Sequence, residues 1–317
     1  MKERAVLFGE TSSLVGVVTD PLEERGDASK AAVILLNPGI VHRVGPGRVY
    51  VKIARRLAAA GFLVLRFDLS GIGDSAVRHD SLPFAKSSIQ EAQKAMDFLH
   101  AARGTAQFVL VGGCSGAEVS LETACLDSRV IGAVLMNFPV TQNEAEETNP
   151  DQLNRNAAHY YWNFALFNLK SWRKLFTGKA DYQRLIRALA FAVRPHFSSR
   201  PQASREISRL RAQLQYLSER AIPLSFVYSE GDPRRHDLRG MVGDELKQLC
   251  ARGKVMLKTV PRADHTFSSL HDHERLLELL LEQVEIITRS NKDQAVVSRT
   301  AAVPLLPLNI GDSVAQL

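Results

Sequence analysis

The sequence of 317 residues contains only three cysteines, Cys114, Cys125 and Cys250. A set this sparse, and odd in number, argues against a disulfide framework and predicts a reducing compartment, which implies a cytoplasmic protein. The cysteines and histidines also lack the spacing of metal ligands, so we expect neither a metal nor another cofactor. Cys125 and Cys250 fall on or near predicted helices and are interpreted as packing residues.

Long apolar stretches are also missing. No apolar run is long enough to be a membrane-spanning helix. The first residues, Met1–Arg4, lead into a strand-like segment rather than a long apolar region, so no secretory signal is visible. The hydrophobic fraction of 45% and the charged fraction of 23% are typical of a soluble globular protein.

Phosphate-binding and nucleic-acid motifs are absent from the sequence. The segment Arg66–Ser75 contains D-x-x-G-x-G-x-S, but its glycine spacing matches neither the dinucleotide fingerprint nor the Walker A motif. We interpret it as a structural loop beside a site. No recognised nucleic-acid module is present, and the positive charges are dispersed rather than arranged as a stripe, so no nucleic-acid partner is expected.

Positive charge is concentrated in one segment. Residues 151–220 hold 13 Lys and Arg against 4 Asp and Glu, whereas the net charge of the whole chain is only +6. One interpretation is attraction of an anionic substrate or partner, such as a phosphopantetheine arm or an acidic carrier protein. The alternative is a set of solvated helix faces.

Short apolar runs alternate with helix-length segments, which indicates an α/β fold with a mostly parallel sheet. The predicted strands are Ala5–Phe8, Leu14–Thr19, Ala32–Leu36, Leu63–Phe67, Phe108–Val111, Ile131–Met136, Leu224–Tyr228 and Val255–Thr259. The predicted helices are Val49–Ala60, Ser87–Ala102, Ala117–Leu126, Asp244–Arg252 and His271–Ile287. The first two strands are close in sequence, which predicts an antiparallel hairpin at the sheet edge.

The alternation stops after the sixth strand, which predicts three parts of the chain. Residues 1–140 and 221–288 form the core, and residues 141–220 form an inserted helical cap. Within the cap, Tyr161 and Trp162 are candidate substrate contacts. Residues 289–317 lack helical periodicity and are interpreted as a tail that packs along the surface or into a neighbouring copy, as in a homodimer.

The most informative stretch is Gly112–Gly116, with the sequence Gly-Gly-Cys-Ser-Gly. It lies between an apolar run and a helical segment, which is the context of a nucleophile elbow, with cysteine as the nucleophile. The flanking glycines suit a strained turn because little room remains beside the nucleophile. The N-terminus of the following helix favours a thiolate at Cys114.

The same stretch can also be aligned as Gly113–Ala117, which would place Ser115 at the centre of the turn. The first glycine of an elbow directly follows the last aliphatic residue of the strand, here Val111, and this favours Cys114 as the centre. In that alignment Ser115 contributes a backbone N–H to an oxyanion hole. A buried cysteine in a glycine-rich turn without chemistry remains the alternative.

A nucleophile needs a base, and the base needs an acid that orients it. Two later strands are followed by loops that present Asp232 and His265 in the order nucleophile, acid, base. All three residues follow strands at their C-terminal ends, where α/β sheets place their sites. Asp264 and Glu230 are alternative acids.

The loop after the third strand is expected to supply the second oxyanion donor. Gly39 allows a tight turn, and the N–H of Ile40 is the candidate donor. His42 and Arg43 are candidate substrate contacts, and the alternative for both is loop packing.

These motifs together resemble those of the α/β-hydrolase superfamily, over about residues 1–288 apart from the cap. The motifs that carry the resemblance are Asn37–Gly39, Asp68–Ser75, Gly112–Gly116, Ser229–Pro233 and Asp264–Phe267. The elbow resembles that of cysteine-nucleophile hydrolases associated with surface-polysaccharide and natural-product biosynthesis. Asn37-Pro38 departs from the His-Gly that usually precedes the oxyanion turn, which puts the second donor in doubt.

A cysteine nucleophile forms a thioester acyl-enzyme. Exchange with a thioester substrate is nearly thermoneutral, and thioesters are open to attack by amines or carbanions, so we expect acyl transfer, thioester hydrolysis or cyclisation on a carrier-bound or CoA-bound acyl group. Two alternatives stay open: an esterase or lactonase of the dienelactone-hydrolase kind, and a non-catalytic binding protein on the same fold.

Overall fold

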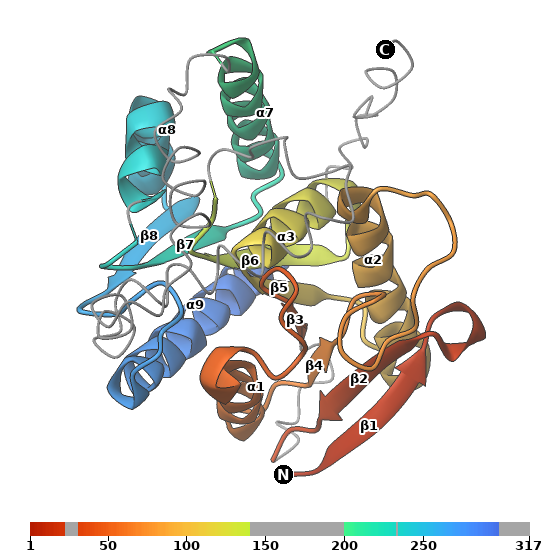
Figure 1. Ribbon diagram of the computed structural model, residues 1–317. Helices are drawn as coiled ribbons and strands as arrows, with labels where there is room; N and C mark the ends of the chain where they lie inside the picture. Colours follow the sequence, from red (N-terminus) through yellow and green to blue (C-terminus); the bar gives the residue numbers. More distant parts are fainter. Residues whose placement is uncertain (23–30, 140–199, 233, 298–317) are drawn as a thin grey trace, which may run out of the picture. The chain divides into compact units, whose positions relative to one another are not determined.

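The computed structural model describes residues 1–22, 31–139, 200–232 and 234–297. These residues form one eight-stranded sheet with helices on both faces (Figure 1). The strands are β1 (Glu3–Phe8), β2 (Leu14–Thr19), β3 (Ala32–Leu36), β4 (Val64–Phe67), β5 (Phe108–Gly113), β6 (Val130–Met136), β7 (Leu224–Ser229) and β8 (Val255–Val260). The predicted fold class, a mostly parallel eight-stranded sheet flanked by helices, is confirmed.

The order of strands across the sheet is β1-β2-β4-β3-β5-β6-β7-β8. β1 and β2 form the predicted antiparallel hairpin at one edge, and β2 also runs antiparallel to β4. The other neighbouring pairs are parallel. Every residue of β3, β5, β6 and β7 is buried, because helices cover both faces of a parallel sheet, and this explains their continuous apolar runs.

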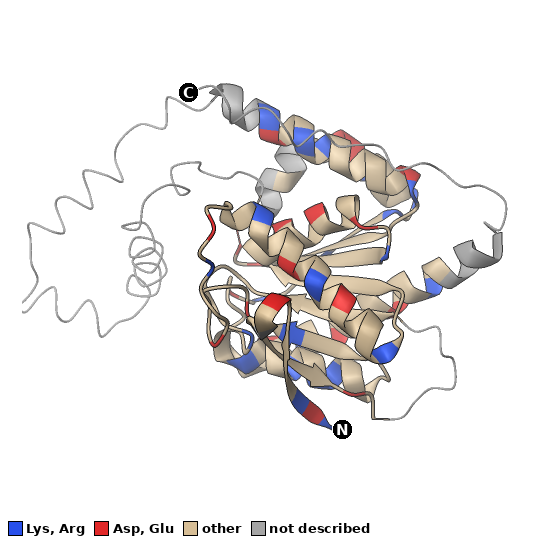
Figure 2. Cartoon of the chain, turned by 90° about the vertical axis from the view of Figure 1, so that its right-hand side faces the viewer, with Lys and Arg blue, Asp and Glu red and all other residues tan. Residues whose placement is uncertain are grey.

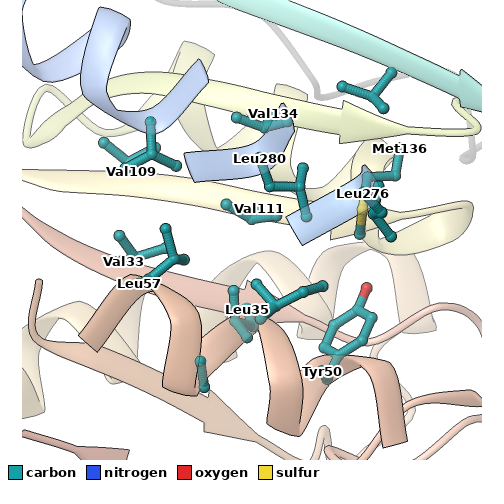
Figure 3. Close-up of a cluster of buried hydrophobic side chains, with 14 of the residues drawn as sticks. Val33, Leu35, Tyr50, Leu57, Val109, Val111, Val134, Met136, Leu276 and Leu280 are labelled. Carbon is teal, nitrogen blue, oxygen red and sulfur yellow. The ribbon is translucent and has the colours of Figure 1, made fainter. Parts of the chain in front are cut away.

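The helices form two layers (Figure 1). On one face, α1 (Val49–Ala59) and α9 (Leu270–Val297) pack against each other and the sheet; on the other, α2 (Phe84–Arg103) packs on α3 (Ser115–Leu126). The first layer encloses a buried apolar cluster with inward residues of β3, β5 and β6 (Figure 3). The apolar faces of α1 and α9 therefore pack on the sheet and hold the ends of β3, β5 and β6 in place.

The chain divides into two compact units, residues 1–140 with 209–317, and residues 141–208. The structure describes only residues 200–208 of the second unit, and residues 141–199 of the predicted helical cap lie outside the described residues. Helix α7 (Arg200–Glu219) continues across the boundary. Its second half buries Leu210, Leu214 and Leu217 in the sheet-containing unit, whose second part begins at residue 209 rather than at the predicted residue 221.

Two helices are longer than predicted. Helix α8 (Arg234–Ala251) starts ten residues before the predicted helix and has a non-helical residue, Val242, within it. Helix α9 continues to Val297, so the first nine residues of the predicted tail are helical. The added end of α9 is polar and lacks an apolar stripe at helical spacing. The added start of α8 carries Leu238 and Val242, both buried and four residues apart, and it was missed although this spacing is helical.

The described helices include none that is long and apolar enough to cross a membrane. Lys and Arg alternate with Asp and Glu on the helices and loops of the described surface (Figure 2). The basic segment identified in the sequence, residues 151–220, lies mostly outside the described residues, so its charge is not assigned to a surface.

Candidate active site

The predicted catalytic residues follow three strands of the same sheet. Cys114 directly follows β5, Asp232 lies three residues after β7, and His265 lies five residues after β8. Because these strands are parallel and lie in the order β5-β6-β7-β8, their C-terminal ends meet at one edge. The fold therefore brings the three loops to the same side of the molecule.

Cys114 occupies a strained turn between β5 and α3. Its backbone angles are φ 51° and ψ −121°, whereas Ser115 is already the first residue of α3. A non-glycine residue in such a conformation is uncommon and is a feature of functional turns. The strain thus falls on the cysteine, and the N-terminus of α3, with its unpaired N–H groups, begins directly after it.

The glycines on either side of the elbow are required by close backbone contacts. A Cβ atom at Gly112 would lie 2.0 Å from the carbonyl oxygen of Gly116. A Cβ atom at Gly116 would lie 2.4 Å from the carbonyl oxygen of Asn37. Both distances are far below van der Waals contact, so no larger residue fits at either position without moving the backbone. These close contacts explain why the elbow has glycine at positions 112 and 116.

Asp232 and His265 form a close pair. The Nδ1 of His265 lies 2.7 Å from Oδ2 of Asp232. The carboxyl side chain is 1% exposed and the imidazole side chain 44% exposed. A buried carboxylate on Nδ1 fixes the imidazole tautomer and leaves Nε2 as the nitrogen available for proton transfer.

The two alternative acids are engaged elsewhere. Asp264 accepts hydrogen bonds from the backbone N–H groups of Thr266 and Ser268, at 3.0 and 2.9 Å, and so closes the turn after β8. Although burial opposes it, these bonds and those from the Thr266 and Ser268 hydroxyls lower the pKa of the Asp264 carboxyl. Glu230 accepts the N–H of Arg262 at 2.6 Å. The structure therefore pairs His265 with Asp232 and gives the other acids loop-holding contacts.

Asn137 is a site residue that sequence analysis missed. It follows β6, has φ 45° and is 2% exposed. Its Nδ2 donates to the carbonyl oxygen of His265 at 2.8 Å, and its Oδ1 accepts the N–H of Ser229 at 2.9 Å. One side chain thus joins the loop of the base to the strand that leads to Asp232. No local sequence signal marks it, because its partners lie 128 and 92 residues away.

Tyr50 is a second residue that the sequence did not reveal. It is fully buried on α1, and Figure 3 shows its ring directed toward the ends of the strands. Its hydroxyl donates to the carbonyl oxygen of Leu36 at 2.9 Å and accepts a hydrogen bond from the backbone of Gly113. Burial raises the pKa of the Tyr50 phenol, so the phenol stays neutral and can donate. Tyr50 therefore bridges the end of β3 and the residue before the nucleophile.

The loop after β3 approaches the elbow through Gly39. The Gly39 N–H donates to the Oγ of Ser115 at 2.8 Å, and Gly39 has φ 59°. Ile40, the predicted donor, has an exposed side chain, and its N–H has no acceptor among the described residues. The amide that contacts the elbow is that of Gly39, and the role of the neighbouring Ile40 N–H as oxyanion donor stays a prediction.

Arg43, a predicted substrate contact, is held by two carboxylates. Its guanidinium pairs with Asp68 and lies 2.6 Å from Asp74, and its backbone N–H donates to Asp68 at 2.5 Å. Asp68 is fully buried, and a Cβ at Gly73 would collide with it. These contacts match the loop packing that the sequence left open as the alternative for Arg43, whose substrate role stays a prediction, and they tie Arg43 to the loop of residues 66–75.

The other predicted contacts are less defined. His42 is exposed, and its Nδ1 accepts the Val44 N–H at 3.4 Å, so its substrate role stays a prediction. Tyr161 and Trp162 lie outside the described residues. In the part of the chain that the structure describes, no cluster of three His, Cys, Asp or Glu side chains has a geometry suited to a metal ion.

A family of known proteins matches most of this chain. The sequence profile of the alpha/beta hydrolase family covers residues 33–279, a range that includes Cys114, Asp232 and His265. No curated protein sequence matches at a significant level. The profile therefore shows which family the chain resembles, whereas the reaction has to be inferred from the residues of the site.

Solved structures of the same architecture span nearly the whole chain. A hypothetical protein from Pseudomonas aeruginosa has a TM-score of 0.55 and 16% identity, covering 89% of this chain and 93% of its own. A proline iminopeptidase from Mycobacterium smegmatis has a TM-score of 0.52 and 15% identity, covering 92% and 100%. A serine hydrolase homologue from Coxiella burnetii has a TM-score of 0.51 and 15% identity, covering 89% and 98%. At such identities the likeness establishes the fold and not the reaction.

Proposed function

Because this chain belongs to the alpha/beta hydrolase family, we propose that it is an acyl-transfer enzyme in which Cys114 forms a thioester acyl-enzyme. His265 is the general base and Asp232 orients it. The observation that carries this proposal is a cysteine, rather than a serine, in the strained turn at the N-terminus of α3, on the same sheet edge as a closely paired His265 and Asp232.

The three residues divide the reaction between them. His265 takes the proton from Cys114, and the thiolate attacks the carbonyl carbon of the substrate. The backbone N–H of Ser115 stabilises the negative charge that develops on the carbonyl oxygen. The intermediate then expels its leaving group, which takes the proton from His265. Attack by water, an alcohol, an amine or a carbanion on the thioester then releases the acyl group.

The nucleophile favours a thioester substrate. Exchange of one thioester for another is nearly thermoneutral, whereas forming a thioester from an oxygen ester is uphill. We therefore propose a CoA-bound or carrier-bound acyl group as the donor, in a reducing cytoplasmic setting of the kind found in natural-product or polysaccharide pathways. The aromatic and basic residues of segment 151–220 are proposed to contact the acyl chain and an anionic carrier arm.

Competition from the other thiols is limited. Burial, with a smaller contribution from the nearby Glu122 carboxylate, raises the pKa of the Cys125 thiol to about 12, so this cysteine stays protonated at neutral pH. Cys250 is only half-buried and lies at the end of α8, far along the chain from the elbow. Cys250 is therefore the informative control for labelling at Cys114.

The proposal is tested by intact-mass analysis after incubation with a series of acyl thioesters. We expect a single acyl adduct in the wild-type protein and in Cys250→Ala, and none in Cys114→Ala. No adduct and no turnover across the series would contradict the proposal. Rapid cleavage of activated esters or lactones, with thioesters ignored, would favour the dienelactone-hydrolase alternative. Alkylation of Cys114 with an ordinary thiol pKa of about 8.5 would favour a binding protein.

A further inference from the structure

The side chain of Ser115 carries a contact that its predicted backbone role does not use. Its Oγ accepts the N–H of Gly39 at 2.8 Å, across 76 residues of sequence. Gly39 lies in the loop after β3, from which the sequence predicts the second oxyanion donor. That amide therefore already has a partner, and the partner is the residue next to the nucleophile.

A serine hydroxyl can accept two hydrogen bonds and donate one. The Gly39 N–H occupies an acceptor position, and the hydroxyl proton has no acceptor among the described residues. The backbone N–H of Ser115 also has no acceptor there, because it belongs to the first turn of α3. The side chain is half-buried rather than sealed, so both donors of Ser115 remain accessible beside Cys114.

We propose that the Ser115 hydroxyl is itself an oxyanion donor, polarised by the Gly39 N–H. The chain of donors runs from the Gly39 N–H to the Ser115 Oγ and from the Ser115 O–H to the substrate oxygen. Each bond in such a chain strengthens the next, because accepting a hydrogen bond makes a hydroxyl a better donor. This inference rests on the proposed function of Cys114.

The role fits the electron flow of the acylation step. The Cys114 sulfur forms a bond to the carbonyl carbon, and the π electrons of the carbonyl move onto its oxygen. That oxygen accepts hydrogen bonds from the N–H and the O–H of Ser115 while it carries the charge. When the carbon–sulfur bond to the leaving thiol breaks, the carbonyl reforms and the leaving thiolate receives the proton held by His265. Ser115 keeps its proton throughout.

Asn37-Pro38 departs from the usual His-Gly before the oxyanion turn, and the Ser115 hydroxyl supplies a donor at this point of the site. The amide that the loop aims at the elbow, that of Gly39, ends on Ser115 rather than in open space. A hydroxyl at residue 115 transmits that amide's polarisation to the substrate, whereas an alanine would remove both the donor and the contact that holds the loop. The structure thus assigns a side-chain function to a position where the backbone alone was expected to act.

The decisive comparison is between Ser115→Ala and Ser115→Thr. Rates are measured with N-acetylcysteamine thioesters from acetyl to octanoyl, and affinities with the trifluoromethyl ketone of the same acyl chain, which forms a charged tetrahedral adduct with a thiolate. Ser120→Ala is the matched control, since Ser120 also lies on α3 but donates to the Gly116 carbonyl at 2.7 Å. Thermal melting shows whether each variant is folded.

We expect Ser115→Ala to lower kcat/KM by about 10²-fold, which is the usual effect of losing one oxyanion donor. The affinity for the ketone should fall by a similar factor, whereas KM stays within about threefold, because the ground-state carbonyl gains little from the donor. Ser115→Thr keeps the hydroxyl and should retain activity within about tenfold. If the bond between the Gly39 N–H and the Ser115 Oγ only held the loop in place, the loss of ketone affinity in Ser115→Ala would not match the loss of kcat/KM.

The outcomes separate this inference from the proposed function. Adduct formation at Cys114 that is as fast in Ser115→Ala as in the wild type would overturn the oxyanion role and leave the nucleophile intact. A rise in KM by the same factor as the loss of ketone affinity would also overturn the oxyanion role, because the donor would then stabilise the ground state as much as the tetrahedral adduct. No adduct in the wild-type protein would overturn both proposals. An adduct mapped to Ser115 would identify the serine as the nucleophile and would likewise overturn both.

Discussion

Two histidines of the same segment, His265 and His273, use the same ring nitrogen to meet partners of opposite charge. The Nδ1 of His265 lies 2.7 Å from Asp232, and the Nδ1 of His273 lies 2.8 Å from the Nζ of Lys52. The His265 side chain is 44% exposed at the sheet edge, whereas His273 is 1% exposed between α1 and α9. The first pair lies at the candidate site, and the second is part of the packing.

The difference shows what makes a histidine a base. A carboxylate on Nδ1 stabilises the imidazolium that forms when the ring accepts a proton at Nε2. An ammonium at the same position opposes protonation. Burial and the charge of Lys52 lower the pKa of His273, although Phe267, Asp272 and Asp264 act in the opposite direction. Its Nε2 is also buried without a partner among the described residues, so no substrate reaches it.

The largest expected effect comes from replacing His265 by glutamine, with the same replacement of His273 as its comparison. His265→Gln removes the general base and should lower kcat/KM for an acyl thioester by about 10³-fold. His273→Gln should change it by less than about threefold, because that ring faces α1 rather than the site. Steady-state kinetics on the two purified variants makes the comparison. Similar losses in both would show that the exposed pair is not the catalytic one.

Neutralising the partner of His265 should have the next largest effect. Asp232→Asn keeps the shape of the side chain but offers an amide in place of a carboxylate. We expect a fall in kcat/KM of about 10²-fold, with the protein still folded. Glu230→Gln is the matched control, because Glu230 is the neighbouring acid and holds only the Arg262 N–H. An effect of Glu230→Gln that exceeds that of Asp232→Asn would reassign the acid.

A smaller effect is expected from the buried hydroxyl that links the two sides of the elbow. Tyr50→Phe removes the bonds to Leu36 and Gly113, so the nucleophile and the oxyanion loop lose a shared support. We expect kcat to fall by about tenfold, with little change in KM. Tyr228→Phe is the control: Tyr228 is also fully buried, and the variant loses a bond of 3.0 Å to the carbonyl of Phe138. Each variant should lose about 1 kcal/mol of unfolding free energy, measured by denaturant titration.

Features that depend on local sequence could be predicted, whereas contacts between distant segments could not. Buried parallel strands are continuous apolar runs, so their positions followed from hydrophobicity alone. Cys114, Asp232 and His265 followed from local motifs at the ends of those runs. Asn137, Tyr50 and the hydroxyl of Ser115 did not, because each acts on atoms supplied by distant segments. The end of α9 lacked the periodicity that reveals a helix, whereas the first half of α8 was missed although Leu238 and Val242 lie four residues apart.

The smallest expected effect is the contribution of His273 to the pH dependence of stability. Its pKa in the folded protein lies below its ordinary value of 6.5, so the unfolded chain binds a proton more readily than the folded one. The free energy of unfolding should therefore be fully retained above about pH 6.5 and decline as the pH falls through the folded pKa. Lys52→Met removes the opposing ammonium and should flatten this decline, and His273→Gln should abolish its contribution. Urea titrations of the wild type and of these variants between pH 5 and 8 measure the slope. An unchanged slope in both His273→Gln and Lys52→Met would show that other groups dominate the titration, and that the buried ammonium does not set the protonation of its neighbour.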